Sequence, residues 1–129
     1  DLSTQYKRIE NEVNDAILQV VKSGNFIGGP EVKTFADNLA RKVGVKHVIP
    51  CANGTDALQI ALMACDLQPG DEVIIPAYTY CSTANVVVHL GAKPVMVDVH
   101  ADDLCIDYED VEQHINEKTK AIIFNGIVR

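Results

Sequence analysis

Residues 69–80 read Pro-Gly-Asp-Glu-Val-Ile-Ile-Pro-Ala-Tyr-Thr-Tyr, and this stretch decides the fold. Within it, Glu72–Pro76 is an apolar run of strand length that follows a Pro-Gly turn. A segment of helical length, 82–90, comes next, and a second apolar run, Pro94–Val99, follows it. A strand, a helix and a strand in this order predict a right-handed βαβ unit with parallel strands. Because the runs are nearly continuously apolar, we expect both faces of the sheet to be buried.

The same alternation extends to both sides of this unit. Two further strand-length runs, His47–Cys51 and Lys120–Phe124, are separated from it by helical segments at 55–66 and 108–117. The pattern predicts an α/β domain with a mostly parallel sheet over residues 46–129. The 55–66 segment is apolar almost all round, which predicts a central, buried helix.

The 108–117 segment has the pattern of a surface helix, with Asp107 as its predicted N-cap. We expect its apolar residues to face the sheet and its acidic residues to face solvent. The apolar set is Tyr108, Val111 and Ile115, and the acidic set is Glu109, Asp110, Glu112 and Glu117.

Residues 1–45 have a different, helical character. Apolar residues recur at helical spacing over 6–22, before a break at Ser23-Gly24. A second helix is predicted to begin near Glu31, after Pro30, and to end at Gly44. The chain is therefore expected to open with two helices ahead of its βαβ units.

The composition excludes several classes of protein. The chain has 129 residues with 11 Lys plus Arg against 18 Asp plus Glu, a net charge of 11 − 18 = −7. No basic stripe is available for nucleic acid, and no apolar run approaches the ~20 residues of a membrane-spanning helix. The start carries no signal peptide pattern. The cysteines and histidines have no metal-ligand spacing, so we expect no metal site and a reducing, cytoplasmic setting.

The segment 52–57, Ala-Asn-Gly-Thr-Asp-Ala, follows the first predicted strand and opens the next helix. In an open parallel sheet, ligands bind where strands end and helices begin. Gly54 allows close approach of the backbone, and first-turn amides with the Thr55 hydroxyl can hold an anion such as a phosphate. The alternative is that Asn53 or Thr55 only caps the helix.

The segment 76–83 follows the second predicted strand, at the same edge of the sheet. It is polar and aromatic, and Tyr80 can stack on a flat ring, with Ser82 and Thr83 capping the next helix. The alternative is an aromatic lid on the core. A phosphate cup beside an aromatic platform indicates a phosphorylated aromatic cofactor.

Four motifs resemble those of the DegT/DnrJ/EryC1/StrS aminotransferases, in the order and spacing of that family. They are Ser-Gly-Asn-Phe-Ile-Gly-Gly-Pro-Glu-Val-Lys-Thr-Phe (23–35), Asn-Gly-Thr-Asp-Ala-Leu (53–58), residues 69–80 as quoted above, and Gly-Ala-Lys-Pro-Val-Met-Val-Asp-Val (91–99). The resemblance runs from about residue 2 to residue 123. It implies part of the three-layer αβα large domain of a pyridoxal phosphate (PLP) enzyme of fold type I.

The resemblance also implies roles for particular residues. Gly54, Thr55 and Asp56 would hold the PLP phosphate, and Tyr80 would stack on the pyridine ring. Phe26, Ile27 and Gly28 would lie near the substrate. Asp98 and Asp107 match family positions as well, and we interpret them as structural, one at a strand end and one as a helix cap.

The resemblance implies catalytic groups that these residues do not supply. Transamination needs a lysine that forms a Schiff base with PLP, and we assign this role to none of the eight lysines. Lys46, Lys93 and Lys120 precede predicted strands and so belong to the wrong edge of the sheet. After Ile123 the chain departs from the family pattern. We expect the 129 residues to be an N-terminal portion without the small C-terminal domain, unable to transaminate.

The resemblance implies an aminotransferase that acts on a nucleotide-linked keto-sugar, with an amino acid such as glutamate or glutamine as amino donor, in amino-sugar or polysaccharide synthesis. Family membership also implies a homodimer. Two alternatives stay open: a PLP-dependent sugar dehydratase of the same family, and a non-catalytic α/β domain that binds a phosphorylated ligand or a protein partner.

Overall fold

A computed structural model describes residues 1–124 of the chain. The chain divides into two compact units, Asp1–Pro50 and Cys51–Arg129, and each is described by itself over its described residues. The boundary between the units lies some five residues later than the predicted change from a helical segment, 1–45, to βαβ units, 46–129, and that domain assignment stays a prediction.

The first unit contains the two predicted helices, α1 (Leu2–Ser23) and α2 (Pro30–Val43). Asp1 caps α1 by accepting a hydrogen bond from the Ser3 amide, and both helices end at a glycine in the left-handed region. This conformation favours glycine, which explains the breaks at Gly24 and Gly44. Among residues 1–124, no helix is both long and apolar enough to cross a membrane.

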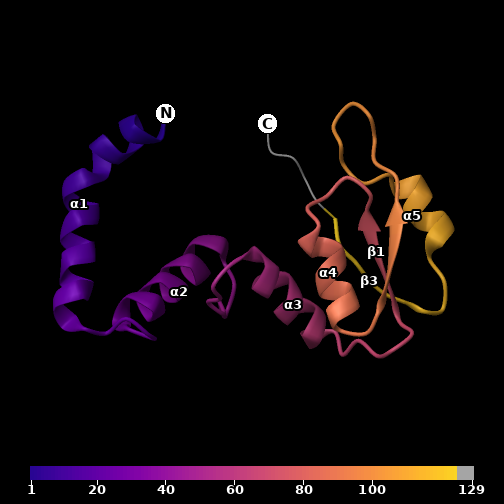
Figure 1. Ribbon diagram of the computed structural model, residues 1–129, viewed down its shortest axis with the longest axis horizontal. Helices are drawn as coiled ribbons and strands as arrows, with labels where there is room; N and C mark the ends of the chain where they lie inside the picture. The colour runs from indigo at the N-terminus through magenta and orange to yellow at the C-terminus, as the bar shows by residue number, and fades with distance from the viewer. Residues whose placement is uncertain (125–129) are drawn as a thin grey trace. The chain divides into compact units, whose positions relative to one another are not determined.

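The second unit is built on a parallel sheet of β1 (Glu72–Pro76), β2 (Lys93–Val97) and β3 (Thr119–Ile122), in the order β2-β1-β3 (Figure 1). The central strand β1 is buried along its whole length, as a strand with a layer on each face must be. The flanking strands are only half-buried, so the prediction of a sheet buried on both faces holds fully for β1 alone.

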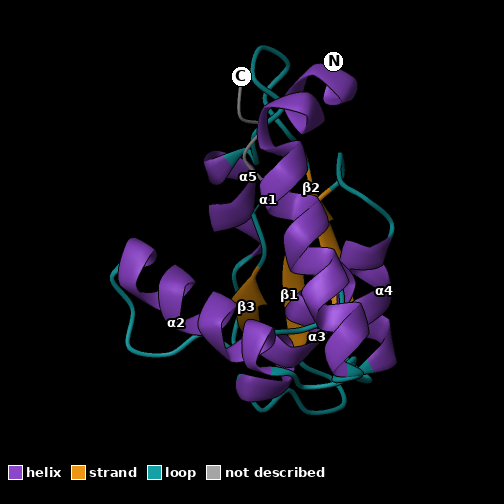
Figure 2. Cartoon of the chain, turned by 90° about the vertical axis from the view of Figure 1, so that its left-hand side faces the viewer, coloured by secondary structure: helices purple, strands orange, loops and turns teal. Residues whose placement is uncertain are grey.

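Helices cover both faces of this sheet. On one face α3 (Gly54–Ala64) and α4 (Ser82–His89) pack over Val73 and Ile75, and on the other α5 (Tyr108–His114) packs over Ile74. Figure 1 shows α4 and α5 on opposite sides of the strands, and Figure 2 shows α4 beside the strands in a view turned by 90°. The fold is therefore the three-layer αβα arrangement predicted from the sequence.

Two predicted elements are different in the structure. His47–Cys51 was predicted as a strand, but it pairs with no strand among the described residues, and Ile49 is 73% exposed. An apolar run becomes a strand only where a neighbour accepts its backbone hydrogen bonds. Helix α3 was predicted to be central, but only its Leu62 is buried and Met63 is 59% exposed, because α3 packs through one side against α4.

The predicted orientation of α5 is also only partly correct. Val111 is buried, whereas Tyr108 and Ile115 are exposed. Ile115 is exposed since the helix ends at His114 and Ile115 lies beyond it. Asp110, predicted to face solvent, is half-buried and bonded to the end of β2. The short helix thus contacts the sheet through one turn only.

Replacing Ile75 by alanine tests the importance of the central strand. Ile75 is fully buried beneath α3 and α4, so Ile75→Ala should lower the free energy of unfolding by about 2–5 kcal/mol. Ile49→Ala, at an exposed site, should change it by less than about 0.5 kcal/mol. Urea denaturation followed by circular dichroism measures both, and equal shifts would contradict the assigned core.

Candidate functional site

The candidate site lies at the edge of the sheet where the parallel strands end. β1 ends at Pro76 and leads through 77–81 into α4, while α3 reaches the start of β1 through 65–71. The first turns of α3 and α4 therefore both lie toward the carboxyl ends of the strands (Figure 1). Helix N-termini carry partial positive charge, so this edge favours an anionic group.

Asn53 builds the first turn of α3. Its Oδ1 accepts a hydrogen bond from the Asp56 amide at 3.0 Å, and its Nδ2 donates to Asp56 Oδ2 at 3.1 Å. The Asn53 carbonyl oxygen accepts from the Ala57 amide at 3.1 Å. Asn53 is thus the N-cap of α3, one of the two capping assignments that the sequence left open.

This capping leaves two donors unused. The amides of Gly54 and Thr55 donate to no acceptor among the described residues. A Cβ added at Gly54 would meet nothing within 4 Å, so the packing of the chain itself does not require glycine there. Two unpaired amides, a neighbouring hydroxyl and open space in front of them suit a phosphate group.

Asp56 is placed differently from what a phosphate contact requires. Its amide is taken by Asn53 Oδ1, and its carboxylate is held by Asn53 Nδ2. Within the chain its role is to stabilise the turn that presents Gly54 and Thr55. Direct contact of Asp56 with a cofactor stays a prediction.

Tyr80 projects from the loop between β1 and α4. Its side chain is 76% exposed, which rules out an aromatic lid on the core. The loop is fixed at both ends, since the Ala77 amide donates to the Val97 carbonyl at 2.8 Å and the Thr83 amide donates to the Tyr80 carbonyl at 2.9 Å. A fixed loop with an exposed ring fits the predicted stacking platform.

The predicted capping of α4 by Ser82 and Thr83 is wrong. The helix is capped at Cys81 without a side-chain hydrogen bond, and Thr83 lies inside the helix. There the Thr83 hydroxyl, which is buried, pairs with the Thr79 hydroxyl at 3.1 Å. Thr83 therefore closes the loop from within the helix rather than capping it.

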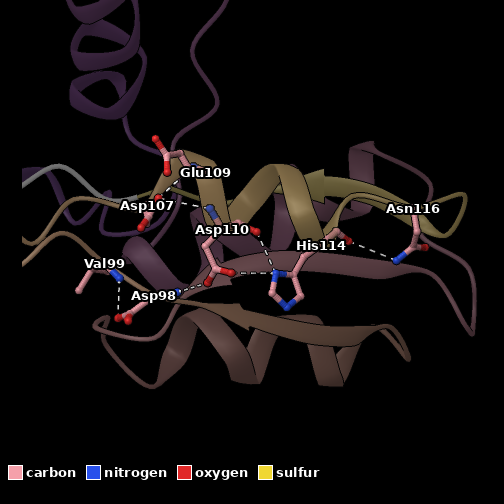
Figure 3. Close-up of polar contacts among 7 residues, drawn as sticks. All are labelled: Asp98, Val99, Asp107, Glu109, Asp110, His114 and Asn116. Carbon is pink, nitrogen blue, oxygen red and sulfur yellow. Dashed lines mark hydrogen bonds and ion pairs between the residues drawn. The ribbon is translucent and has the colours of Figure 1, made fainter.

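A network of carboxylates fixes the end of β2 (Figure 3). The Asp98 amide donates to Asp110 Oδ2 at 2.8 Å, and Asp98 Oδ1 accepts from the Val99 amide at 2.8 Å. Asp107 caps α5 by accepting from the Glu109 and Asp110 amides, as predicted. His114 Nδ1 lies 3.2 Å from Asp110 Oδ1. No sequence pattern indicates the contact of Asp110 with Asp98, because it joins residues twelve apart in different elements.

Phe26, Ile27 and Gly28 belong to the first unit, in the loop between α1 and α2. Phe26 and Ile27 are exposed, at 68% and 97%, and Gly28 has a φ of +64°. Phe26 also borders a hollow beside Ile17 and Val20 of α1. Their predicted contact with a substrate is not tested by this geometry and stays a prediction.

Three lysines of the second unit lie at the opposite edge of the sheet. Lys93 begins β2, Lys118 precedes β3, and Lys120 is the second residue of β3. Lys46, predicted to precede a strand, precedes none, because His47–Cys51 forms no strand in the structure. In the described part of the second unit, no lysine lies in the segments 53–56 and 77–81 that form the candidate site.

An αβα fold with unpaired amides at a helix N-terminus and an exposed tyrosine at the same edge of the sheet is typical of enzymes that bind a phosphorylated cofactor. Residues 7–127 match the model of the DegT/DnrJ/EryC1/StrS aminotransferase family. The chain belongs to this family.

Individual relatives agree with this assignment. The chain is 49% identical to UDP-2-acetamido-2-deoxy-3-oxo-D-glucuronate aminotransferase of Pseudomonas aeruginosa, over 95% of the chain and 34% of the relative. A DegT DnrJ EryC1 StrS aminotransferase from Brucella abortus superposes with a TM-score of 0.89 at 45% identity, over 96% of this chain and 35% of that one.

A third similarity is to an enzyme with a different activity. GDP-4-keto-6-deoxy-D-mannose-3-dehydratase of E. coli with bound hydrated PLP superposes with a TM-score of 0.80 at 28% identity, over 86% of this chain and 30% of that one. The chain spans about a third of the length of the curated relatives it matches.

Substitution of Asn53 tests the construction of the first turn of α3. Asn53→Ala removes the cap and should lower the free energy of unfolding by about 0.5–2 kcal/mol, whereas Asn53→Ser keeps a capping oxygen and most of the stability. Thermal unfolding followed by circular dichroism measures the difference. If the serine variant lost as much stability as the alanine variant, the capping role would be wrong.

Proposed function

We propose that residues 51–124 bind the phosphate and ring of PLP in an enzyme that transfers an amino group to a nucleotide-linked keto-sugar. One observation carries the proposal: the unpaired amides of Gly54 and Thr55 open α3 on the same side of the sheet as the exposed ring of Tyr80. When bound, PLP supplies an electron sink for the amino-transfer chemistry.

Each candidate residue has a separate task in this proposal. The amides of Gly54 and Thr55 and the Thr55 hydroxyl bind the phosphate, and Asp56 holds the turn through Asn53. Tyr80 covers one face of the pyridine ring. Phe26–Gly28 contact the sugar substrate from the loop of the first unit.

The substrate and partners follow from family membership and from the relatives' names. The Pseudomonas relative is named for an oxo-sugar acid linked to UDP, and this supports a nucleotide-linked keto-sugar as the substrate here. We further propose an amino acid, such as glutamate or glutamine, as amino donor, a homodimer as the assembled state, and a cytoplasmic location. The scattered cysteines support the location, since no disulfide links them among the described residues.

A second candidate is the removal of a sugar hydroxyl. The structural likeness to the E. coli dehydratase supports it, because the match covers 86% of this chain and that structure holds bound hydrated PLP. The two activities differ at the residue that would react with the cofactor, and none of the segments at the candidate site contains a lysine. A third possibility, binding of a phosphorylated ligand without catalysis, would need only the phosphate site formed by the amides of Gly54 and Thr55 and the Thr55 hydroxyl.

PLP affinity tests the proposed site. Gly54→Ala should weaken PLP binding by about tenfold or more, because a methyl group would obstruct the phosphate, while thermal stability stays close to that of the native chain. Tyr80→Ala should weaken it roughly two- to twelvefold. Calorimetric titration with PLP and with pyridoxal measures both effects, and Gly54→Ala should leave the weaker binding of pyridoxal unchanged.

Tyr108→Ala is the matched control, since Tyr108 is also an exposed tyrosine but begins α5 on the other face of the sheet. Its PLP affinity should equal that of the native chain. Equal affinities for PLP and pyridoxal in the native chain would contradict the phosphate cup.

The placement of the lysines predicts how the 129 residues behave with an amino donor. Mixed with PLP and glutamate, they should bind the cofactor without forming 2-oxoglutarate, because Lys93, Lys118 and Lys120 lie at the opposite edge of the sheet. Chromatography of the products measures 2-oxoglutarate. Catalytic turnover by this chain would overturn the assignment of its lysines.

A further inference from the structure

Glu72 is the one charged residue that is buried among residues 1–124, with 8% of the residue's surface exposed. It begins β1, so it lies at the amino edge of the sheet, opposite the candidate site. A buried carboxylate is unfavourable unless its oxygens are paired. Its surroundings therefore indicate why this position keeps a charge.

The two carboxylate oxygens of Glu72 have partners on different strands. Oε1 accepts from Lys93 Nζ at 3.0 Å, and Lys93 begins β2. Oε2 accepts from Asn116 Nδ2 at 2.9 Å. Asn116 lies in the turn that leads from α5 into β3, and Figure 3 shows its contact with His114. One side chain on the central strand thus holds the starts of both neighbouring strands.

The side-chain amide of Asn116 is held in a single orientation. Its Nδ2 also donates to the His114 carbonyl at 3.2 Å, and its Oδ1 accepts from the Lys118 amide at 2.8 Å. The turn is closed further by Thr119, whose hydroxyl accepts a hydrogen bond from the backbone amide of Asn116 at 3.0 Å. Asn116 can therefore offer only a donor to Glu72, because reversing its side-chain amide would break two other bonds.

β3 needs such a link because its own pairing is short and irregular. It has four residues, two of them exposed, and its register with β1 shifts between Glu72 and Val73. The Glu72 amide donates to the Lys118 carbonyl at 2.8 Å, directly beside the contact of its side chain with Asn116. The backbone and the side chain of Glu72 thus fix the same turn.

We propose that Glu72 is an acid-sensitive lock that holds the turn 116–119, and with it β3, in register on β1. Both groups that face its oxygens are donors. When the Glu72 carboxylate is protonated, one of its oxygens becomes a hydrogen-bond donor and faces the donor of Lys93 or Asn116. The hydrogen bond at that oxygen is then lost. The contact with the turn has no replacement among the described side chains.

The charges around the lock set the direction of its pH dependence. The hydrogen bond from Asn116 and then that from Lys93 lower the pKa of Glu72, burial opposes them, and the positive charges of Lys93 and Lys118 lower it further. A carboxylate with a lowered pKa in the folded state stabilises that state fully above its ordinary pKa of 4.5. This stabilisation is lost as the pH falls through the lowered value.

Amide hydrogen exchange of the full chain tests the lock. Glu72→Gln imitates the protonated state, since its amide also points a donor at one of the two partners. At pH 7 it should speed exchange of the Lys118–Ile122 amides by about tenfold or more, and that of Lys93–Val97 by clearly less. Glu112→Gln, an exposed carboxylate on α5 with no partner among the described residues, is the matched control and should change neither.

A second substitution should restore the lock. In the Glu72→Gln background, Asn116→Asp supplies an acceptor for the glutamine amide but loses the bond to the His114 carbonyl, so exchange in Lys118–Ile122 should slow again in part. In the native chain, the amide exchange rate, corrected for its intrinsic dependence on pH, should be constant above about pH 4.5. As the pH falls below this value, the rate should rise first in Lys118–Ile122. This second measurement decides the question even if Glu72→Gln does not fold.

Three results would overturn the proposal. They are native-like exchange in Glu72→Gln, equal loss of protection in β2 and β3, and no faster exchange of Lys118–Ile122 below pH 4.5 in the native chain. None of them bears on PLP binding, which belongs to the opposite edge of the sheet.

Discussion

The burial of β1 on both faces is the constraint on which the second unit depends. Val73 and Ile75 point into one helical layer and Ile74 into the other, and all three are fully buried. A parallel strand in this position requires helices on both sides, and each helix that leads into or out of it begins at the carboxyl edge. The turn with two unpaired amides and the exposed tyrosine lie at the same edge of the sheet as a consequence of that arrangement.

Features with a local cause could be predicted from the sequence. Gly24 and Gly44 end helices because of their own backbone conformation, and Asp107 caps α5 through its nearest neighbours. The run His47–Cys51 was predicted wrongly, because the pattern of a strand gives no information about whether a neighbour pairs with it. The contact between Glu72 and Asn116 joins residues 44 apart and left no periodic signal.

The sequence indicated the position of the candidate site better than it indicated the hydrogen bonds within the site. The order of strands and helices pointed to Gly54, Thr55 and Tyr80, although the strand predicted before 52–57 is absent, and the family resemblance added Asp56. That these residues hold a cofactor stays a prediction. It could not predict that Asn53 and Asp56 satisfy each other's side chains, since this depends on the exact path of the turn. Their mutual pairing is the reason that the amides of Gly54 and Thr55 are left for a ligand.

The start of β1 carries the lock residue Glu72, whereas its end leads into the loop of the candidate site. This separation has an evolutionary consequence. The five residues of the strand separate the lock at Glu72 from the loop after Pro76 by about 16 Å. Substitutions this far apart, without shared partners, usually have additive effects. Ligand preference at one edge can therefore drift while selection for a stable sheet acts at the other. A small sheet built in this way can serve a family whose members differ in substrate and even in reaction.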